Sequence, residues 1–267
     1  MKSIRELMDL SGRAALVTGG AGHIGRACCE ALAEMGCAVA VIDLDQDSCR
    51  ETADDLARRF EVSTLPLALD LADEKAVVAA PDRVADALGS LGILVNCAAF
   101  VGTSKLQGWG VPFEQQRLDT WRAALEVNLT APFALIQAAV RHLRASGHGS
   151  VVNVSSTYGV VGPDWSLYEG TSMSNPAAYA ASKGGLIQLT RWLATTLAPD
   201  VRVNSLCPGG VFRNQPECFV RRYEARTPAG RMATEEDMKG TLLYLAGDLS
   251  RYVTGQNIMV DGGWTAW

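Results

Sequence analysis

The sequence predicts a doubly wound α/β fold, in which a parallel sheet is covered by helices on both faces. Strand-like and helical segments alternate along the chain, which is the order that produces parallel strands joined by helical crossovers. The strand-like segments are almost wholly apolar rather than alternating, as expected for strands buried on both faces. The chain of 267 residues has no internal repeat, low-complexity tract or long linker, so we expect residues 1–267 to form one domain.

Each expected element has a local signal. Residues 13–18 (RAALVT) are an apolar run that stops at glycines, and residues 24–35 continue with a helical pattern. Residues 38–42 (AVAVI) repeat the strand signal, and right-handed crossovers should join each strand to the next parallel one. The other expected strands are 63–69, 93–96, 150–154, 202–206 and 257–260, and the other expected helices are 48–60, 73–88, 120–145 and 177–197.

Two polar stretches interrupt this alternation, near residues 102–118 and 159–176. Each follows the carboxyl end of an expected strand, the edge at which open parallel sheets bind ligands. Loops of this length inside a compact domain are usually functional or disordered. These insertions are therefore candidates for shaping a substrate site.

Composition and charge exclude several classes of protein. Hydrophobic residues make up 48% of the chain, which is enough for a sizeable core. The 24 basic and 29 acidic residues give a net charge of −5 and a pI near 5.3, so the chain has no basic character suited to nucleic acid. We find no apolar run long enough to span a membrane, and the first residues lack the apolar region of a signal peptide.

The cysteines and histidines indicate a reducing compartment and no metal site. Seven cysteines, an odd number without a C-x-x-C pair, argue against a disulfide framework and against zinc. We interpret them as small buried residues of a cytoplasmic protein. The three histidines are too dispersed to form a metal site.

A glycine-rich turn between the first expected strand and helix predicts a dinucleotide site. Residues 18–25 read TGGAGHIG, and glycines there let the backbone turn sharply and approach a pyrophosphate closely. The following helix adds unpaired N–H groups and the positive end of its dipole. The residues expected to contact the cofactor here are Gly19, Gly22, His23, Ile24 and Gly25.

An acidic residue at the end of the second expected strand indicates which dinucleotide binds. Asp43 lies roughly 20 residues past the glycines, where a carboxylate accepts hydrogen bonds from the adenosine ribose hydroxyls. A carboxylate repels the 2′-phosphate of NADP(H), and we find no basic residue between positions 38 and 48. We therefore predict NAD(H) as the cofactor, with Leu44 beside Asp43 in its site.

Several further motifs occur in an order that is typical of one family. They are Asp70-Leu71, residues 96–99 (NCAA), Asn128, residues 153–156 (NVSS), residues 179–183 (YAASK), residues 208–210 (PGG) and residues 260–263 (VDGG). Together with the glycine-rich turn, they make residues 12–263 resemble a short-chain dehydrogenase/reductase of the compact subgroup. The resemblance implies a single Rossmann-type domain that binds a nicotinamide dinucleotide.

Two positions depart from the motifs of that subgroup. His23 stands where the compact form has its middle glycine, so the glycine spacing matches the extended subgroup instead. Ala99 replaces the last glycine of the motif after the fourth strand, which should shift the backbone slightly near the nicotinamide ribose. We expect the cofactor to bind despite both changes.

The central chemical feature is a pair of residues, Tyr179 and Lys183, which are four positions apart and share one face of the expected helix. A phenol has an ordinary pKa near 10, and a neighbouring ammonium group should lower that pKa. Such a tyrosine can act as a general acid or base near neutral pH. The resemblance implies that Tyr179 transfers the proton at the substrate oxygen and that Lys183 also binds the nicotinamide ribose.

The resemblance implies further catalytic and cofactor-binding residues. Ser156 would polarise and orient the substrate oxygen, with the adjacent Ser155 as its rival. Asn128 would hold a water that links Lys183 to solvent, or be a buried amide that distorts its helix, and both roles can hold together. The other implied cofactor residues are Asp70 and Leu71 at the adenine, Asn96 and Ala98 in the segment beneath the ribose, and Pro208, Gly209 and Val211 near the nicotinamide and its carboxamide.

Aromatic side chains interleaved with amides, hydroxyls and charges in the two long loops favour a polyhydroxylated substrate over a steroid or an acyl chain. Residues 158–183 and 208–215 resemble family members associated with flagellin or surface-polysaccharide sugar modification. We therefore expect a sugar or sugar derivative, whose anionic group, if present, meets Arg213, Lys105 or Arg117. Equally, the loops could cover the sheet or form a subunit contact. The candidate substrate-binding residues are Trp109, Tyr158, Trp165 and Arg213.

The sequence therefore predicts an NAD(H)-dependent oxidoreductase that interconverts a secondary alcohol and a ketone by hydride transfer. One alternative keeps its NAD bound and acts as a sugar epimerase or dehydratase, which the glycine spacing mildly favours. A second is an inactive dinucleotide sensor or scaffold, against which the complete catalytic set argues. A third is a 3-oxoacyl-type carbonyl reductase, which the fold alone does not exclude.

The resemblance also implies a homotetramer, because members of the family commonly pair the long helices that here span residues 120–145 and 177–197. Trp264 and Trp267 lie near the end of the chain. They could lie at a subunit contact or pack on their own chain. The expected partners are a small-molecule substrate and further copies of the chain.

Overall fold

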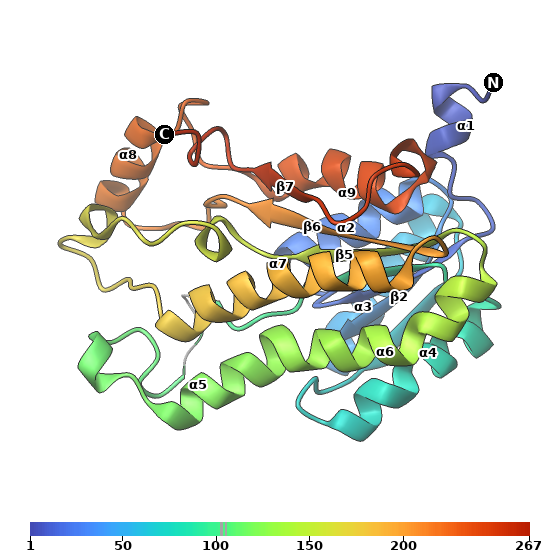
Figure 1. Cartoon of the computed structure of the whole chain (residues 1–267), viewed down its shortest axis with the longest axis horizontal. Coiled ribbons are helices and arrows are strands. Elements are labelled where there is room, and N and C mark those ends of the chain that lie inside the picture. Colours follow the sequence, from blue (N-terminus) through green and yellow to red (C-terminus); the bar gives the residue numbers. More distant parts are fainter. Residues whose placement is uncertain (102–103, 105) are drawn as a thin grey trace.

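One parallel sheet of seven strands forms the centre of the molecule (Figure 1). The computed structural model describes residues 1–101, 104 and 106–267. The strands lie in the order β3-β2-β1-β4-β5-β6-β7, so the chain reverses its direction across the sheet between β1 and β4. The strands are β1 (Ala14–Thr18), β2 (Ala38–Asp43), β3 (Thr64–Ala68), β4 (Ile93–Asn96), β5 (Gly149–Val154), β6 (Val201–Pro208) and β7 (Asn257–Val260). They confirm the expected strands.

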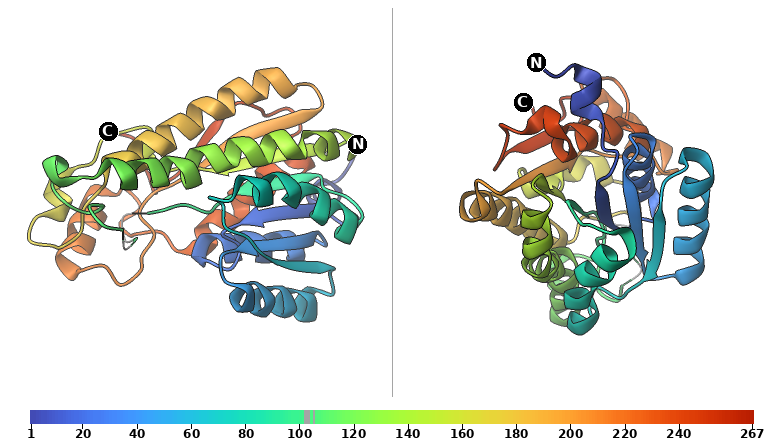
Figure 2. Two further views of the ribbon diagram at one scale, coloured as in Figure 1. Left: turned by 90° about the horizontal axis from the view of Figure 1, so that it is seen from below. Right: turned by 90° about the vertical axis from the view of Figure 1, so that its right-hand side faces the viewer.

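Helices cover both faces of this sheet (Figure 2). They are α1 (Ile4–Met8), α2 (His23–Glu34), α3 (Gln46–Phe60), α4 (Glu74–Leu88), α5 (Leu118–Leu125), α6 (Ala131–Ala145), α7 (Ala177–Leu197), α8 (Glu217–Arg226) and α9 (Lys239–Ala246). On one face, α2, α3 and α9 enclose a core that contains Val17 and Leu32. On the other, α4, α6 and α7 enclose a core that contains Leu16 and Leu135. Successive residues of β1 therefore enter opposite cores, which explains its continuous apolar sequence.

The expected helix over residues 120–145 is in fact two α-helices joined by a π-helical turn. α5 ends at Leu125, the turn spans Glu126–Thr130, and α6 begins at Ala131. The wider turn accommodates a buried amide at Asn128, whose hydrogen bonds are described below. The sequence analysis also missed α1, α8 and α9, which are short helices of ten residues or fewer.

Among the described residues, one helical stretch, Leu118–Ala145, is long and apolar enough to cross a membrane by length and composition. Its α6 segment places Leu135, Ile136 and Leu143 in the core against the sheet. The stretch therefore fits a core helix of this fold. All seven cysteines are free thiols, as expected.

Candidate active site

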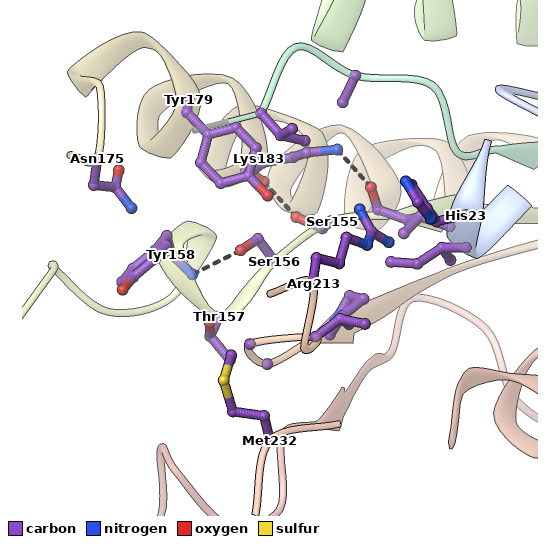
Figure 3. Close-up of a pocket in the computed structure, with 18 of the residues that line it drawn as sticks. His23, Ser155, Ser156, Thr157, Tyr158, Asn175, Tyr179, Lys183, Arg213 and Met232 are labelled. Atoms are coloured by element: carbon purple, nitrogen blue, oxygen red, sulfur yellow. Dashed lines mark hydrogen bonds between the residues drawn. The ribbon is translucent and has the colours of Figure 1, made fainter. Parts of the chain in front are cut away.

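A cavity of about 500 Å³ lies at the carboxyl ends of the strands, near the reversal between β1 and β4. This is the edge at which doubly wound sheets bind ligands. The glycine-rich turn, the ends of β5 and β6, the first turns of α7 and the segments after β6 line it. Figure 3 shows His23, Ser156, Tyr179 and Lys183 around this space.

The glycine-rich turn forms a cradle that side chains would fill. Gly19 has a φ of +66°, and a Cβ on Gly25 would lie 1.9 Å from the carbonyl oxygen of Gly19. α2 begins directly after Gly22, which offers its first N–H groups no side-chain partner. The close backbone and the open helix end fit the pyrophosphate of a dinucleotide. All five residues predicted here line the cavity: Gly19, Gly22, His23, Ile24 and Gly25.

A smaller pocket of about 100 Å³ adjoins the cradle, and Asp43, Leu44, Asp70 and Leu71 line it. The carboxylate of Asp43 accepts hydrogen bonds from the backbone N–H groups of Ala21 at 3.2 Å and Leu44 at 2.8 Å. These bonds fix the carboxylate between the two cavities, because Asp43 lines both. These are the residues that the sequence predicts at the adenosine of the cofactor, whose ribose would face Asp43.

The residues predicted beneath the ribose tie strands together in this structure. Asn96 Nδ2 donates to Asn153 Oδ1 at 2.8 Å and so links β4 to β5. The N–H of Ala98 donates to Thr18 Oγ1 at 3.3 Å. Neither Asn96 nor Ala98 lines the two cavities, whereas the neighbouring Ala99 does. Pro208, Gly209 and Val211 line the larger cavity, as their predicted place near the nicotinamide requires.

α7 presents Tyr179 and Lys183 to the cavity from one face. Lys183 is 2% exposed, and its ammonium group donates to the backbone carbonyl of Val154 at 2.7 Å. Its Nζ lies 5.9 Å from the centre of the Tyr179 ring. Burial lowers the pKa of Lys183 to about 8, because an enclosed ammonium group loses its hydration. The group is still mostly charged at neutral pH.

The expected lowering of the Tyr179 pKa is wrong for this arrangement. Burial raises the pKa of Tyr179 above its ordinary value, although hydrogen bonding to the Ser156 side chain acts in the opposite direction. The physical reason is that burial removes the water that would solvate a phenolate, while the ammonium group of Lys183 is bonded to Val154. In this arrangement, the loss of water around the phenol therefore outweighs the hydrogen bond from Ser156 that favours the phenolate.

The two adjacent serines have different environments. The Ser155 hydroxyl donates to the backbone carbonyl of Lys183 at 2.8 Å, which commits it to holding α7 against β5. Ser156 Oγ accepts the N–H of Tyr158 at 3.1 Å and contacts the phenol of Tyr179. This geometry favours Ser156 over Ser155 as the group that meets a substrate oxygen.

Asn128 joins the π-helical turn to its surroundings. Its Nδ2 donates to Phe100 O and to Ser182 Oγ, each at 3.1 Å. Its Oδ1 accepts the N–H of Phe100 at 2.8 Å. The side chain is thus the buried structural amide that the sequence allowed, and the water between Asn128 and Lys183 stays a prediction.

The four candidate substrate residues separate into two groups. Tyr158 and Arg213 line the cavity. Trp109 is 2% exposed in a separate apolar cluster, where its indole N–H bonds to a backbone carbonyl. Trp165 is 55% exposed and does not line the cavity. The prediction that Trp109 and Trp165 reach this cavity is therefore not supported, and Lys105 lies outside the described residues.

Arg213 belongs to the cofactor end of the cavity. Its Nε donates to Glu235 Oε1 at 3.1 Å, and His23 Nδ1 lies 3.8 Å from the same oxygen. Figure 3 shows its guanidinium group beside His23 at the glycine-rich turn. This position suits a cofactor phosphate better than a substrate anion. Arg117, another candidate cation, pairs with Asp119 outside this cavity.

Most of the aromatic residues at the other end of the cavity were not predicted from the sequence. We call Tyr158, Tyr168, Phe219, Tyr223 and Trp264 the aromatic wall, because all five line this end. They come from the insertion before α7, from α8 and from the segment after β7. No local pattern groups residues so distant in sequence, and the only signal was the aromatic content of the insertion.

Comparison with known proteins gives matches along nearly the whole chain. A family model described as enoyl-(acyl carrier protein) reductase matches residues 19–265. The chain is 35% identical to cis-4-hydroxycyclohexanecarboxylate dehydrogenase of Sinomonas cyclohexanicum, over 95% of this chain and 97% of the relative. It is 34% identical to a probable galactose dehydrogenase of Rhizobium meliloti, over 96% of each chain. It is 28% identical to the post-translational flagellin modification protein A of Campylobacter coli, over 96% of this chain and 99% of the relative.

Solved structures of related proteins also match the chain along nearly its whole length. A short-chain type dehydrogenase/reductase from Mycobacterium marinum has a TM-score of 0.87 and 30% identity, with 100% of both chains covered. A putative NAD(P) dependent gluconate 5-dehydrogenase from Beutenbergia cavernae, with bound NADP at low occupancy, has a TM-score of 0.86 and 34% identity over 98% and 100%. The chain belongs to the short-chain dehydrogenase/reductase family. It is an alcohol or ketone oxidoreductase that uses a nicotinamide dinucleotide.

Proposed function

We propose that the protein is an NAD(H)-dependent oxidoreductase that interconverts a secondary alcohol and a ketone on a sugar or sugar derivative. The observation that carries this proposal is the position of Ser156, Tyr179 and Lys183 in the same cavity as the glycine cradle. A proton-transfer group thus lies beside the space that a nicotinamide needs.

Each of the three side chains has one task in the reaction. The Ser156 hydroxyl donates to the substrate oxygen and holds it next to Tyr179. Tyr179 gives its proton to that oxygen during reduction and takes it back during oxidation. The Lys183 ammonium group binds the ribose hydroxyls, and its charge favours any phenolate that forms. The bound cofactor supplies or accepts the hydride.

Asp43 supports NAD(H) over NADP(H), because its fixed carboxylate would repel a 2′-phosphate. Among the described residues that line the smaller pocket, none is basic. Calorimetric titration should show NAD⁺ binding at least ~10-fold more tightly than NADP⁺, since about 1.4 kcal/mol of repulsion gives that factor. Asp43→Ser combined with Leu44→Arg should reverse the preference. Equal affinities in the unmodified protein would contradict the proposal.

The sugar assignment is supported by the hydroxyl, amide and aromatic groups at the substrate end of the cavity. Two relatives are named for sugar or sugar-acid oxidation, a galactose dehydrogenase and a gluconate 5-dehydrogenase. A second candidate is reduction of an acyl ketone, because a 3-oxoacyl-[acyl-carrier-protein] reductase of Aquifex aeolicus is 30% identical over 96% of this chain. We also infer that the protein acts in the cytoplasm, where its free cysteines remain reduced.

A substrate screen tests the proposal. Purified protein is incubated with sugars, polyols and an acetoacetyl thioester, with NAD(H) or NADP(H), and the absorbance of the reduced cofactor is followed. We expect oxidation of at least one sugar or cyclic polyol with NAD⁺. Turnover of the thioester alone would select the acyl ketone. Release of tightly held NAD from denatured protein, without any net change in absorbance, would select an epimerase or dehydratase.

A further inference from the structure

The five side chains of the aromatic wall contact one another in a closed ring. Tyr158 meets Trp264 edge-on at 6.3 Å between ring centres, and Trp264 stacks on Tyr223 at 5.9 Å. Tyr223 stacks on Phe219 at 6.1 Å, and Phe219 meets Tyr168 at 5.4 Å. The Tyr168 and Tyr158 hydroxyls, 2.8 Å apart, complete this ring of contacts. Such a surface offers broad apolar faces at the end of the cavity that Tyr158 shares with the catalytic Ser156 (Figure 3).

Two polar atoms at this end of the cavity have no partner. Asn175 is 6% exposed and Trp264 is 3% exposed, and both line the cavity. Asn175 Oδ1 is an acceptor without a donor, and Trp264 Nε1 is a donor without an acceptor. Buried polar groups are almost always paired, so unpaired atoms of opposite kind on two residues that line one cavity point to a ligand that supplies both.

The charged residues of the cavity lie elsewhere. Among the described residues that line it, Asp43, Lys183 and Arg213 are charged, and all three belong to the cofactor and catalytic end. Arg226 does approach Trp264, at 5.1 Å from its ring, and pairs with Asp164, but neither residue lines the cavity. The described part of the aromatic end therefore offers no ionic partner to a carboxylate or phosphate.

We propose that the aromatic wall is a subsite for an uncharged six-membered ring that carries at least one hydroxyl besides the reacting one. This inference rests on the proposed function. The apolar face of the ring packs against the aromatic side chains. A hydroxyl is donor and acceptor at once, so such groups pair Asn175 Oδ1 and Trp264 Nε1. The sugar or sugar derivative expected from the sequence is thereby narrowed to one whose ring carries no anionic group.

Steady-state kinetics with a graded set of ring alcohols tests the subsite. The probes are cyclohexanol, the 1,2-, 1,3- and 1,4-cyclohexanediols, and 4-hydroxycyclohexanecarboxylate, each with NAD⁺. We expect the best diol to exceed cyclohexanol in kcat/KM by at least ~10-fold, because a site built around a hydroxyl rejects an analogue that lacks it. The carboxylate should be no better than cyclohexanol.

Two variants test whether the preference for a diol over cyclohexanol depends on the unpaired atoms. Trp264→Phe keeps an aromatic ring but removes the N–H, and Asn175→Ala removes the acceptor. Each should reduce kcat/KM for the best diol by about 10-fold or more, with little change for cyclohexanol. Trp192→Phe is the matched control, because Trp192 is exposed on α7 and does not line the cavity, and it should leave the ratio unchanged.

The outcomes separate this inference from the proposed function. Calorimetric binding of NADH to every variant shows whether the cofactor site is intact, and circular dichroism shows whether the fold is. Equal use of diol and cyclohexanol, preference for the carboxylate, or a ratio that neither variant changes would overturn the subsite. Turnover of non-cyclic ketones alone would also overturn it while leaving the reaction class in place. Failure to bind any dinucleotide would instead overturn the proposed function.

Discussion

The ammonium group of Lys183 is charged although the side chain is almost completely buried. Its bond to the Val154 carbonyl orients the ammonium group toward the cavity end shared by the glycine cradle and Tyr179. Burial opposes ionisation of both Lys183 and Tyr179 when the cavity is considered without cofactor. We therefore expect the bound cofactor and substrate to contribute to the activation of the phenol.

Replacing Lys183 by Met should change how stability depends on pH. The pKa of about 8 in the folded protein lies below the ordinary 10.5, so between these values the unfolded chain binds more protons. Wild-type stability relative to Lys183→Met should therefore rise as the pH increases from about 8 to 10. Urea unfolding of both proteins at several pH values measures this difference. A difference that stays constant or falls over that interval would contradict the buried charge.

Tyr179→Phe should reduce kcat by at least ~100-fold, the usual scale of general acid–base catalysis. Affinity for NADH should stay within about threefold, because the change removes one hydroxyl and leaves the glycine cradle intact. Stopped-flow hydride transfer and calorimetry measure the two quantities on the same preparation. A kcat within tenfold of wild type would contradict the proposed role of Tyr179 in proton transfer.

At the scale of elements, the first turn of α2 allows almost no added volume. A Cβ on Gly25 would lie 1.9 Å from Gly19 O, whereas a Cβ on Gly240 in α9 would meet nothing within 4 Å. Gly25→Ala should cost at least ~2 kcal/mol of unfolding free energy, as overpacking does, and should weaken NADH binding. Gly240→Ala is the control and should be neutral or stabilising by up to ~1 kcal/mol. Equal urea midpoints for the two variants would show that the glycine-rich turn accommodates the added Cβ without a loss of unfolding free energy.

The sequence predicted those parts of the fold and site that lie within short continuous segments. The seven strands, the glycine-rich turn and Asp43 each depend on neighbouring residues, so spacing identifies them, and the ordered motifs of the family added the pair on α7. A distortion of the helix at Asn128 was predicted, but its π-helical form was not, because that form depends on bonds from Asn128 to Phe100 and Ser182, which are far away in the chain. The packing of Trp109 in a separate apolar cluster was not predictable, because composition does not say which way a loop side chain points.

At the scale of the whole molecule, the long helices leave large apolar side chains in contact with solvent. Phe133 on α6 is 43% exposed and Trp192 on α7 is 57% exposed. α7 lies alongside α5 and the π-helical turn, as Figures 1 and 2 both show. Exposed aromatic side chains on neighbouring helices of this kind are typical of subunit contacts. They support the homotetramer that the sequence predicts through the family resemblance.

Light scattering on the eluting protein tests this assembly. We expect a mass of about four times the 28.5 kDa chain. The double variant Phe133→Glu, Trp192→Glu should produce a smaller species, because buried unpaired carboxylates are costly at an interface. The variant Ile4→Glu, at an exposed apolar residue of α1, is the control and should keep the native mass. A monomeric wild-type protein would contradict the prediction.

The position of Trp264 gives the protein an internal optical signal. Its indole is enclosed beside Tyr223, as that of Trp109 is in its own cluster outside the cavity, whereas Trp165, Trp192 and Trp267 are open to water. Excited indoles shielded in this way emit at shorter wavelengths than hydrated ones. A guest molecule that settles against Trp264 and takes up its N–H will shift and dim that blue component. Binding in the cavity can therefore be followed in real time by tryptophan fluorescence, without any label and before a single turnover has occurred.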